Sequence, residues 1–280
     1  MNASIEANAD QAEFWNGAAG RGWVEAQRVL DRMLLPFEEL LVRKISRVGP
    51  RSVLDIGCGT GSTTIAAARS LGEGGRCVGI DISAPMIALA RERASAEGVS
   101  AEFVCADAQV HAFDSSGFDL LVSRFGIMFF DDPAAAFANL RRAARREASL
   151  YFLAWRSPEE NDFMTAAEHA VKDYLPEMEP RLPGAPGQFA FADRDRVAAL
   201  LTTGGWHQVS IEAIDVSCST SREDLAEYVT WVGPVGRALQ AVDESMRQSV
   251  LDRAIAAFKP WIHGDMLRFE AACWGIRAHA

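Results

Sequence analysis

Short apolar runs and longer amphipathic segments take turns along the first half of the chain. Apolar runs of strand length cover residues 51–56, 76–80, 101–105, 118–122 and 148–155. Ala-rich segments with helical spacing fill most of the gaps between them. Strands that alternate with helices pair in parallel through right-handed crossovers. The pattern therefore predicts an α/β fold with a mostly parallel sheet over residues 51–156.

The helices expected between these strands cover residues 60–71, 84–97 and a segment that opens with Pro133. Cations at the end of a helix complement its dipole. We therefore interpret a basic run as the end of the third helix rather than as a nucleic-acid contact. This run contains Arg141, Arg142, Arg145 and Arg146.

Two segments outside this alternation predict a cap and a lid. Apolar residues recur as two helices between residues 11 and 48, so we expect residues 1–50 to form an N-terminal helical cap. Residues 157–190 contain five prolines and one helical stretch, at 161–174. Long irregular segments in compact domains are commonly functional. We expect this insertion to be a substrate lid.

Residues 191–280 are expected to return to the core. They predict a helix that ends at Leu201, followed by a strand at 206–217. Two further helices, at 221–239 and 243–258, form a helical insertion before a last strand at 266–277.

Composition and charge narrow the functional classes. The 280 residues are 49% hydrophobic with a formal net charge of −10, which argues against a broad electrostatic grip on nucleic acid or an anionic membrane. The five cysteines form no C-x-x-C pair, so they predict reduced thiols and no metal site. The polar start lacks the apolar stretch of a signal peptide, and no apolar run approaches the ~20 residues of a membrane span. We expect a cytoplasmic protein with a small-molecule substrate and no nucleic-acid or membrane partner, and we leave a homodimer open.

A glycine loop follows the first predicted strand. Residues 53–62 have the sequence Val-Leu-Asp-Ile-Gly-Cys-Gly-Thr-Gly-Ser, and a helical pattern follows them. Glycines at such a turn let a ligand lie against the backbone, and N–H groups at the helix start face it. A dinucleotide fingerprint needs its third glycine one residue later, where this chain has Ser62. The carboxylate of Asp55 would repel a pyrophosphate, whereas it suits a cationic amino group.

This loop resembles motif I of the class I S-adenosylmethionine-dependent methyltransferases, and Asp81, Asp107 and the pair Phe118-Asp119 complete the set of residues that carries the resemblance. The Phe-Phe-Asp-Asp-Pro stretch at residues 129–133 is similar to the ubiquinone/menaquinone C-methyltransferase-like subgroup. The resemblance implies S-adenosyl-L-methionine as the cofactor. It also implies a Rossmann-like, seven-stranded sheet of order 3-2-1-4-5-7-6 with strand 7 antiparallel, which fits the two strands expected in residues 191–280.

We expect the cofactor at the carboxyl ends of successive strands, where ligands bind in open α/β sheets. Asp81 ends the second strand about 20 residues past the loop, the position of a ribose ligand. The alternative role is a helix cap, although Ser83 can cap by itself. The resemblance assigns the adenine amino group to Asp107 and the adenine ring to the backbone of Ala108.

Further cofactor contacts are expected from the loop, from the strand ends and from the cap. They are Asp55, Gly57, Cys58, Gly59, Thr60, Gly61, Ile82, Met86, Ser123, Arg124, Trp23 and Gln27. For Met86 and for the aromatic residues of the cap, ordinary packing is the alternative.

The expected reaction is an in-line displacement that moves a methyl group to an apolar or aromatic metabolite. Phe129, Phe163 and Tyr174 are the expected substrate contacts, with packing of the following helix as the alternative for Phe129. Among the five histidines we select His169, in the expected lid, as the general base. An acid, Tyr174 or no base at all stays open, since amines, thiols and carbanion-like carbons can react without one.

Three other functions stay open at this point. A dinucleotide oxidoreductase would need a hydride site such as Tyr-x-x-x-Lys, which we do not find. The acidic charge argues against a nucleic-acid or protein methyltransferase, and so does the lack of an Asn/Asp-Pro-Pro-Tyr/Phe element after the fourth strand. A non-catalytic protein that binds the cofactor would be separated from an enzyme by combined binding and turnover assays.

Overall fold

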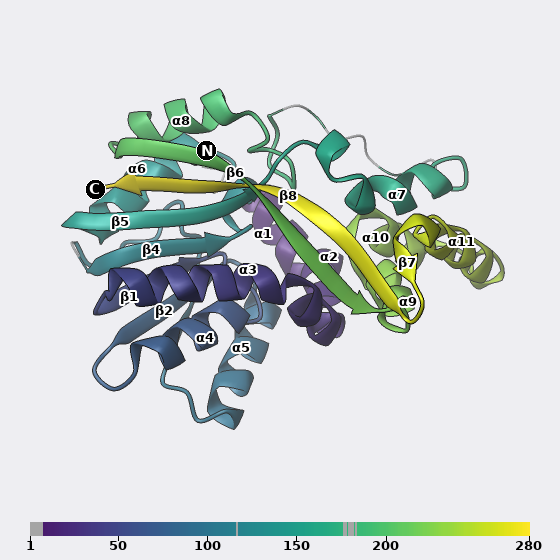
Figure 1. The fold of residues 1–280 in the computed structure, drawn as a ribbon, viewed down its shortest axis with the longest axis horizontal. Helices are drawn as coiled ribbons and strands as arrows, with labels where there is room; N and C mark the ends of the chain where they lie inside the picture. Colours follow the sequence, from purple (N-terminus) through teal and green to yellow (C-terminus); the bar gives the residue numbers. More distant parts are fainter. Residues whose placement is uncertain (1–7, 116, 176–177, 179–181, 183) are drawn as a thin grey trace, which may run out of the picture.

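The computed structural model describes residues 8–115, 117–175, 178, 182 and 184–280. Its centre is one sheet with the strand order β3-β2-β1-β4-β5-β8-β6, in which the short β7 pairs with β8 (Figure 1). The strands are β1 (Ser52–Ile56), β2 (Arg76–Asp81), β3 (Glu102–Cys105), β4 (Phe118–Arg124), β5 (Ala144–Trp155), β6 (His207–Ser221), β7 (Ile262–His263) and β8 (Met266–His279).

Strand direction follows the expectation. Strands β3, β2, β1, β4 and β5 pair in parallel, whereas β8 is antiparallel to both β5 and β6. All five residues of β1 are buried because this strand lies at the centre of the sheet, which explains its continuous apolar run. The Rossmann-like order predicted from the resemblance is confirmed, with β8 in the place of strand 7. The two-residue β7 was not predicted.

Helices cover both faces of the sheet and its ends (Figure 1). They are α1 (Ala9–Asn16), α2 (Ala18–Glu25), α3 (Gln27–Val48), α4 (Ser62–Leu71), α5 (Ala84–Ala96), α6 (Pro133–Ala143), α7 (Asp162–Val171), α8 (Arg194–Thr203), α9 (Asp224–Trp231), α10 (Gly233–Ala241) and α11 (Glu244–Ala256). The single-turn helices are η1 (Ile127–Phe129), η2 (Pro158–Glu160) and η3 (Lys259–Trp261).

The N-terminal cap has three helices rather than the two that we predicted. Gly17 separates α1 from α2, and Ala26 separates α2 from α3. Helix α2 packs closely on the C-terminal insertion, because a Cβ atom on Gly22 would lie 2.2 Å from the carbonyl oxygen of Trp231. Glycine spacing that interrupts the helical pattern thus marks a helix junction and a close helix contact.

Two other boundaries differ from the prediction. Helix α6 ends at Ala143, so Arg145 and Arg146 belong to β5, where Ala144 already pairs with Phe118 of β4. The C-terminal insertion contains three helices instead of two. Gly233 has a left-handed φ of 75° and breaks the helical run between α9 and α10.

Helices α7, α9, α10 and α11 gather around the outer parts of β6 and β8, at the end of the sheet away from the C-terminus (Figure 1). This end is the one at which the parallel strands finish, because Trp155 at the end of β5 pairs with Cys273, while Ser149 pairs with His279. Both insertions therefore lie on the side where a ligand of the sheet is expected. Within the described residues, no helix combines the length and apolar character required for crossing a bilayer.

Candidate functional site

The carboxyl ends of β1, β2, β3 and β4 meet at one edge of the sheet. The backbone N–H of Gly57 donates to the Ile80 carbonyl at 2.9 Å, and the N–H of Ala106 donates to the Asp81 carbonyl at 3.0 Å. The end of β4 reaches the same place, because the Ser123 hydroxyl donates to the Ile56 carbonyl at 2.6 Å. The structure therefore brings the glycine loop, Asp81 and the segment after β3 together.

The conformation of the glycine loop has no room for side chains at its three glycines. Gly57, Gly59 and Gly61 all have positive φ, at 65°, 55° and 86°. A Cβ on Gly57 would lie 2.6 Å from the Cα of Gly126, and a Cβ on Gly61 would lie 2.9 Å from the Cβ of Ala90. The loop is thus a tight cradle from which α4 starts, as the sequence predicts.

The Asp55 side chain is buried in the interior, and one of its oxygens has no partner among the described residues. Its side chain is 1% exposed, and Oδ2 accepts a hydrogen bond of 2.7 Å from the Thr64 hydroxyl. Oδ1 is buried and has no hydrogen-bond partner among the described residues. Burial raises the pKa of Asp55 to about 7, although Thr64 and the nearby Arg124 cation act in the opposite direction.

Asp81 is held by backbone groups on both sides. Oδ2 accepts from the N–H of Gly59 at 2.8 Å, and Oδ1 accepts from the N–H of Ser83 at 2.9 Å. Burial raises its pKa, partly offset by these hydrogen bonds. The carboxylate thus links the glycine loop to the start of α5. One expectation is wrong here: the Ser83 hydroxyl does not cap α5 but donates to the Trp15 carbonyl at 2.7 Å.

Asp107 lies just beyond β3, as predicted, and is half-buried. Its Oδ1 accepts from the N–H of Gln109 at 2.9 Å and from Nδ2 of Asn8 at 3.2 Å. Its Oδ2 is buried and unpartnered among the described residues. Burial is also the main reason why the pKa of this carboxyl is raised. The neighbouring Ala108 is buried, and its carbonyl accepts from Asn139 at 3.0 Å.

Helix α1 lies across these strand ends and is tied down at both of its own ends. Asn8, at its start, joins Asp107 to the N–H of Asp131. Asn16, at its end, donates to the Ile82 carbonyl at 3.1 Å and accepts from the N–H of Ala84 at 2.8 Å. The amide of Asn16 therefore caps α5 in place of Ser83.

The residues after β4 lie where we expected the methionine half of the cofactor. The Ser123 hydroxyl is fully buried and used within the backbone, since it also accepts from the N–H of Gly126 at 3.1 Å. It therefore positions the loop after β4 rather than presenting a free hydroxyl. Arg124 is half-buried, with its guanidinium 3.5 Å from the Ser62 hydroxyl.

A second set of contacts ties helix α3 to the glycine loop. Arg93 of α5 donates to the Thr60 carbonyl at 2.7 Å and forms an ion pair with Asp31 of α3. Gln27 donates to the same Asp31 carboxylate, and Glu38 accepts from the Ser62 hydroxyl. Gln27 therefore contacts the loop only indirectly, through Asp31 and Arg93.

The remaining predicted cofactor contacts are mostly packed. Met86 is 3% exposed, with its sulfur 3.8 Å from the position of a Cβ on Gly59, so it forms the floor under the loop. Cys58 is buried, and Ile82 is half-buried beneath Asn16. Trp23 packs edge-on against Trp15, at 6.2 Å between ring centroids.

Among the predicted substrate residues, only Phe129 is near these strand ends. It is half-buried, and its ring lies 4.9 Å from that of Trp15 of α1. Phe163 is instead 3% exposed and stacks on Phe269 at 3.7 Å, inside the aromatic core of the C-terminal insertion. The prediction that Phe163 lines a substrate pocket is wrong, because its ring is enclosed on several sides. The rings around it also include Tyr228, Phe258 and Trp261.

The other two acceptor-side predictions lie on the surface. Tyr174 is 42% exposed and packs under the Arg253 guanidinium at 4.4 Å. His169 is exposed in the last turn of α7. The structure places this imidazole at the surface and shows no contact that supports a role as general base, so that role stays a prediction.

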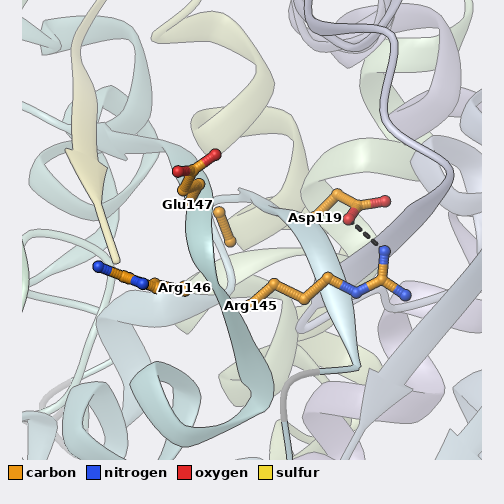
Figure 2. A pocket seen from close by; sticks show the side chains of 5 residues that line it. Asp119, Arg145, Arg146 and Glu147 are labelled. Carbon is orange, nitrogen blue, oxygen red and sulfur yellow. Dashed lines mark hydrogen bonds and ion pairs between the residues drawn. The ribbon is translucent and has the colours of Figure 1, made fainter.

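A surface hollow of about 440 Å³ lies elsewhere (Figure 2). It is lined by Asp119, Arg145, Arg146, Glu147 and Ala148, at the amino ends of β4 and β5, and Figure 2 shows Arg145 paired with Asp119. This is the edge opposite the glycine loop. Asp119 also accepts from the backbone N–H groups of Arg51 and Ser52, so it anchors strand starts. The described residues hold no cluster of three or more His, Cys, Asp or Glu arranged for a metal ion.

Sequence reasoning missed the polar residues that the cap contributes. Asn8, Asn16 and Glu38 reach the strand ends from the N-terminal helices. Glu38 is a polar residue on the otherwise apolar face of α3, whereas Asn8 and Asn16 stand at the ends of the short helix α1 without any pattern that marks them. Such a residue can equally be solvated, and only the packing of α1 and α3 shows where it points.

Comparison with known proteins identifies the central part of the chain. Residues 53–147 match the family model described as a methyltransferase domain. A demethylmenaquinone methyltransferase of Thermus thermophilus is 32% identical over 114 residues, 41% of this chain and 51% of that protein. The aklanonic acid methyltransferase DauC of a Streptomyces species is 35% identical over 105 residues, 37% of this chain and 48% of that protein. The chain thus spans about half the length of these curated relatives.

Solved structures extend the likeness to the fold. The YcgJ protein of Bacillus subtilis superposes with a TM-score of 0.55 at 16% identity, covering 86% of this chain and 97% of that one. At this identity the similarity establishes the fold alone.

Proposed function

We propose, from the premise that residues 53–147 form a methyltransferase domain, that the chain is an S-adenosylmethionine-dependent methyltransferase acting on a small-molecule acceptor. One observation carries the proposal. Asp55 Oδ1 and Asp107 Oδ2 are both buried and unpartnered among the described residues. Folded proteins satisfy nearly all buried polar atoms, so two such oxygens at one edge of a sheet favour a ligand that brings a donor for each.

The donors of S-adenosylmethionine match this edge. Its ammonium group suits the Asp55 carboxylate, and its adenine amino group suits Asp107. Each oxygen of Asp81 accepts one backbone N–H, which leaves further lone pairs for the two ribose hydroxyls. Three carboxylates at one edge disfavour a pyrophosphate, so the dinucleotide alternative finds no support.

The cationic side of the proposed site belongs to Arg124. Its guanidinium lies beside Ser62 at the start of α4 and lowers the pKa of Asp55 electrostatically. We assign to it the carboxylate of the methionine moiety. The amino acid tail would then lie between one cation and one anion of this chain.

The bound cofactor supplies an electrophilic methyl group on a sulfonium centre. The chain has to hold that methyl group in line with the acceptor and keep water away from it. The rings of Phe129 and Trp15 meet near the strand ends, and aromatic faces of this kind also attract a cation. Relatives named for demethylmenaquinone and aklanonic acid support a small organic acceptor, and we assign no general base.

Calorimetric titration with S-adenosylmethionine and S-adenosylhomocysteine tests the proposal. Asp81→Ala should weaken binding by about 1–3 kcal/mol, because charge-assisted hydrogen bonds to the ribose are lost. Asp114→Ala, which removes an exposed loop acid, is the matched control and should bind as the wild type does. A wild-type protein that binds neither compound would refute the proposal. Binding without methyl transfer to any of a panel of quinols and phenols would favour the non-catalytic alternative.

A further inference from the structure

Helix α1 carries a buried acceptor that has no partner. Gln11 Oε1 is enclosed and accepts no hydrogen bond from any described residue. It lies one turn after Asn8, whose side chain reaches Asp107. Gln11 and Trp15 lie one turn apart on the same face of α1, and the Trp15 ring contacts Phe129 after β4, so Gln11 lies on the helix face that meets the strand ends.

Asn8 and Gln11 have the spacing of a capping box, in which the N-cap and N3 side chains satisfy each other's backbone N–H groups. Asn8 is the N-cap of α1, yet its side chain makes no capping hydrogen bond. It binds Asp107 and the N–H of Asp131 instead. Asn8 therefore does not cap α1, and its side chain is turned toward the sheet.

The position of Gln11 follows from the two ends of α1. The helix starts against Asp107, beyond β3, and finishes with Asn16 against Ile82, beyond β2. Trp15, one turn after Gln11, contacts Phe129 and accepts from Ser83. Gln11 therefore lies on α1 between the contact with Asp107, beyond β3, and the contact with Ile82, beyond β2.

Two buried acceptors at the contact between α1 and the sheet thus lack a donor among the described residues: Asp107 Oδ2 on the sheet and Gln11 Oε1 on the cap. A primary amino group on an aromatic ring carries two N–H bonds in one plane, and a single such group can satisfy both. We infer that Gln11 is a second recognition residue for the exocyclic amino group of adenine, which donates one N–H to Asp107 and the other to Gln11. This inference rests on the proposed function, and it assigns to the N-terminal cap a direct part in choosing the nucleoside.

The test is a double-mutant cycle between Gln11→Met and the ligand. Methionine has nearly the volume of glutamine and no amide acceptor. S-adenosylhomocysteine and S-inosylhomocysteine, in which an oxygen replaces the amino group, are titrated into wild type and variant. Gln11→Met should weaken binding of the adenosyl compound roughly threefold to tenfold, the range for one lost hydrogen bond. It should leave the inosyl compound unaffected or improve its binding, because one repelling acceptor is gone.

Two controls separate recognition from folding. Glu13→Met introduces the same side chain on the exposed face of α1 and should change neither affinity. The unliganded Gln11→Met protein should melt at the same temperature as the wild type or higher, since a buried unsatisfied acceptor is removed. A residue that only packs α1 would lower the melting temperature when replaced.

Equal weakening of both ligands by Gln11→Met would overturn the inference, and so would unchanged affinity for the adenosyl compound. A wild type that binds neither ligand would remove the proposed function, and this inference with it. If wild type and Gln11→Met bind the adenosyl compound with the same affinity, the proposed function stands and only the role of Gln11 is refuted.

Discussion

Replacing Asp55 by Asn tests the electrostatics of the site most directly. The change keeps the volume of the side chain and an oxygen that can accept from Thr64, 2.7 Å away. It removes a carboxylate that is 1% exposed and whose Oδ1 has no partner among the described residues. We expect the variant to be more stable without ligand at neutral pH and to bind the cofactor more weakly.

The size of the stability effect follows from the pKa. Burial raises the pKa of Asp55 from 3.8 to about 7. The unfolded chain therefore releases this proton first as the pH rises, and the folded state binds more protons in between. Stability must then fall as the pH rises from about 4 to about 7 and stay level above that. The full difference is on the order of 4 kcal/mol.

The assay is chemical unfolding of both proteins at several pH values from 5 to 8. Asp81 and Asp107 also have raised pKa values, and both proteins keep them. Because the Asp81 charge raises the pKa of Asp55, the comparison reports the titration of Asp55 together with its coupling to Asp81. The advantage of Asp55→Asn should grow by about 3 kcal/mol between pH 5 and pH 8. A difference that does not change with pH would show that Asp55 is not a buried acid with a raised pKa, and the assignment of its free oxygen to an ammonium group would fail too.

Two further predictions concern residues that the structure moves out of the site. Phe163→Ala should destabilise the chain by about 3–5 kcal/mol in chemical unfolding, because a ring stacked on Phe269 at 3.7 Å is deleted from a buried cluster; cofactor affinity below the transition should stay the same, and a selective loss of affinity would return Phe163 to the pocket. His169→Gln should change stability by less than about 0.5 kcal/mol, since the ring is exposed, and turnover should persist; a hundredfold loss of turnover in a folded variant would reinstate His169 as the base.

The sheet could be predicted because its rules are local. Each parallel strand is a short buried run beside a helix with its own period, and the crossover rule then orders the elements. The glycine loop and the starts of β1, β2, β3 and β4 were therefore predicted to within one residue, whereas β5 starts at Ala144, four residues before the predicted position. The missed boundaries depend on tertiary contacts instead. Residues Arg145 and Arg146 continue a basic helical pattern, but pairing of Ala144 with Phe118 draws them into β5.

The site residues show the same difference between positions set by local rules and positions set by tertiary packing. Asp55, Asp81 and Asp107 follow strands, and strand ends in a parallel sheet converge whatever the rest of the chain does. Phe163 and His169 lie in the insertions, whose helices pack by side-chain shape and leave no periodic signal of which face meets the sheet. An aromatic residue in a lid and one in a core have the same pattern in the sequence. Only the ring contacts of Phe163 decide between them.

Helix α1 shows why the cap matters to binding even though its residues carry no motif. Asp107 Oδ1 accepts from Asn8 at the start of this helix, and its Oδ2 is buried without a partner among the described residues, so a ligand that binds this carboxylate also meets the helix. Asn8 and Asn16 hold the two ends with hydrogen bonds of 2.8 to 3.2 Å to the strand-end loops. Each of these bonds contributes little net free energy, and together they fix α1 against the loops that follow β2 and β3. These hydrogen bonds link the N-terminal cap to the proposed adenine site, so under the proposed function a change that loosens α1 should weaken cofactor binding.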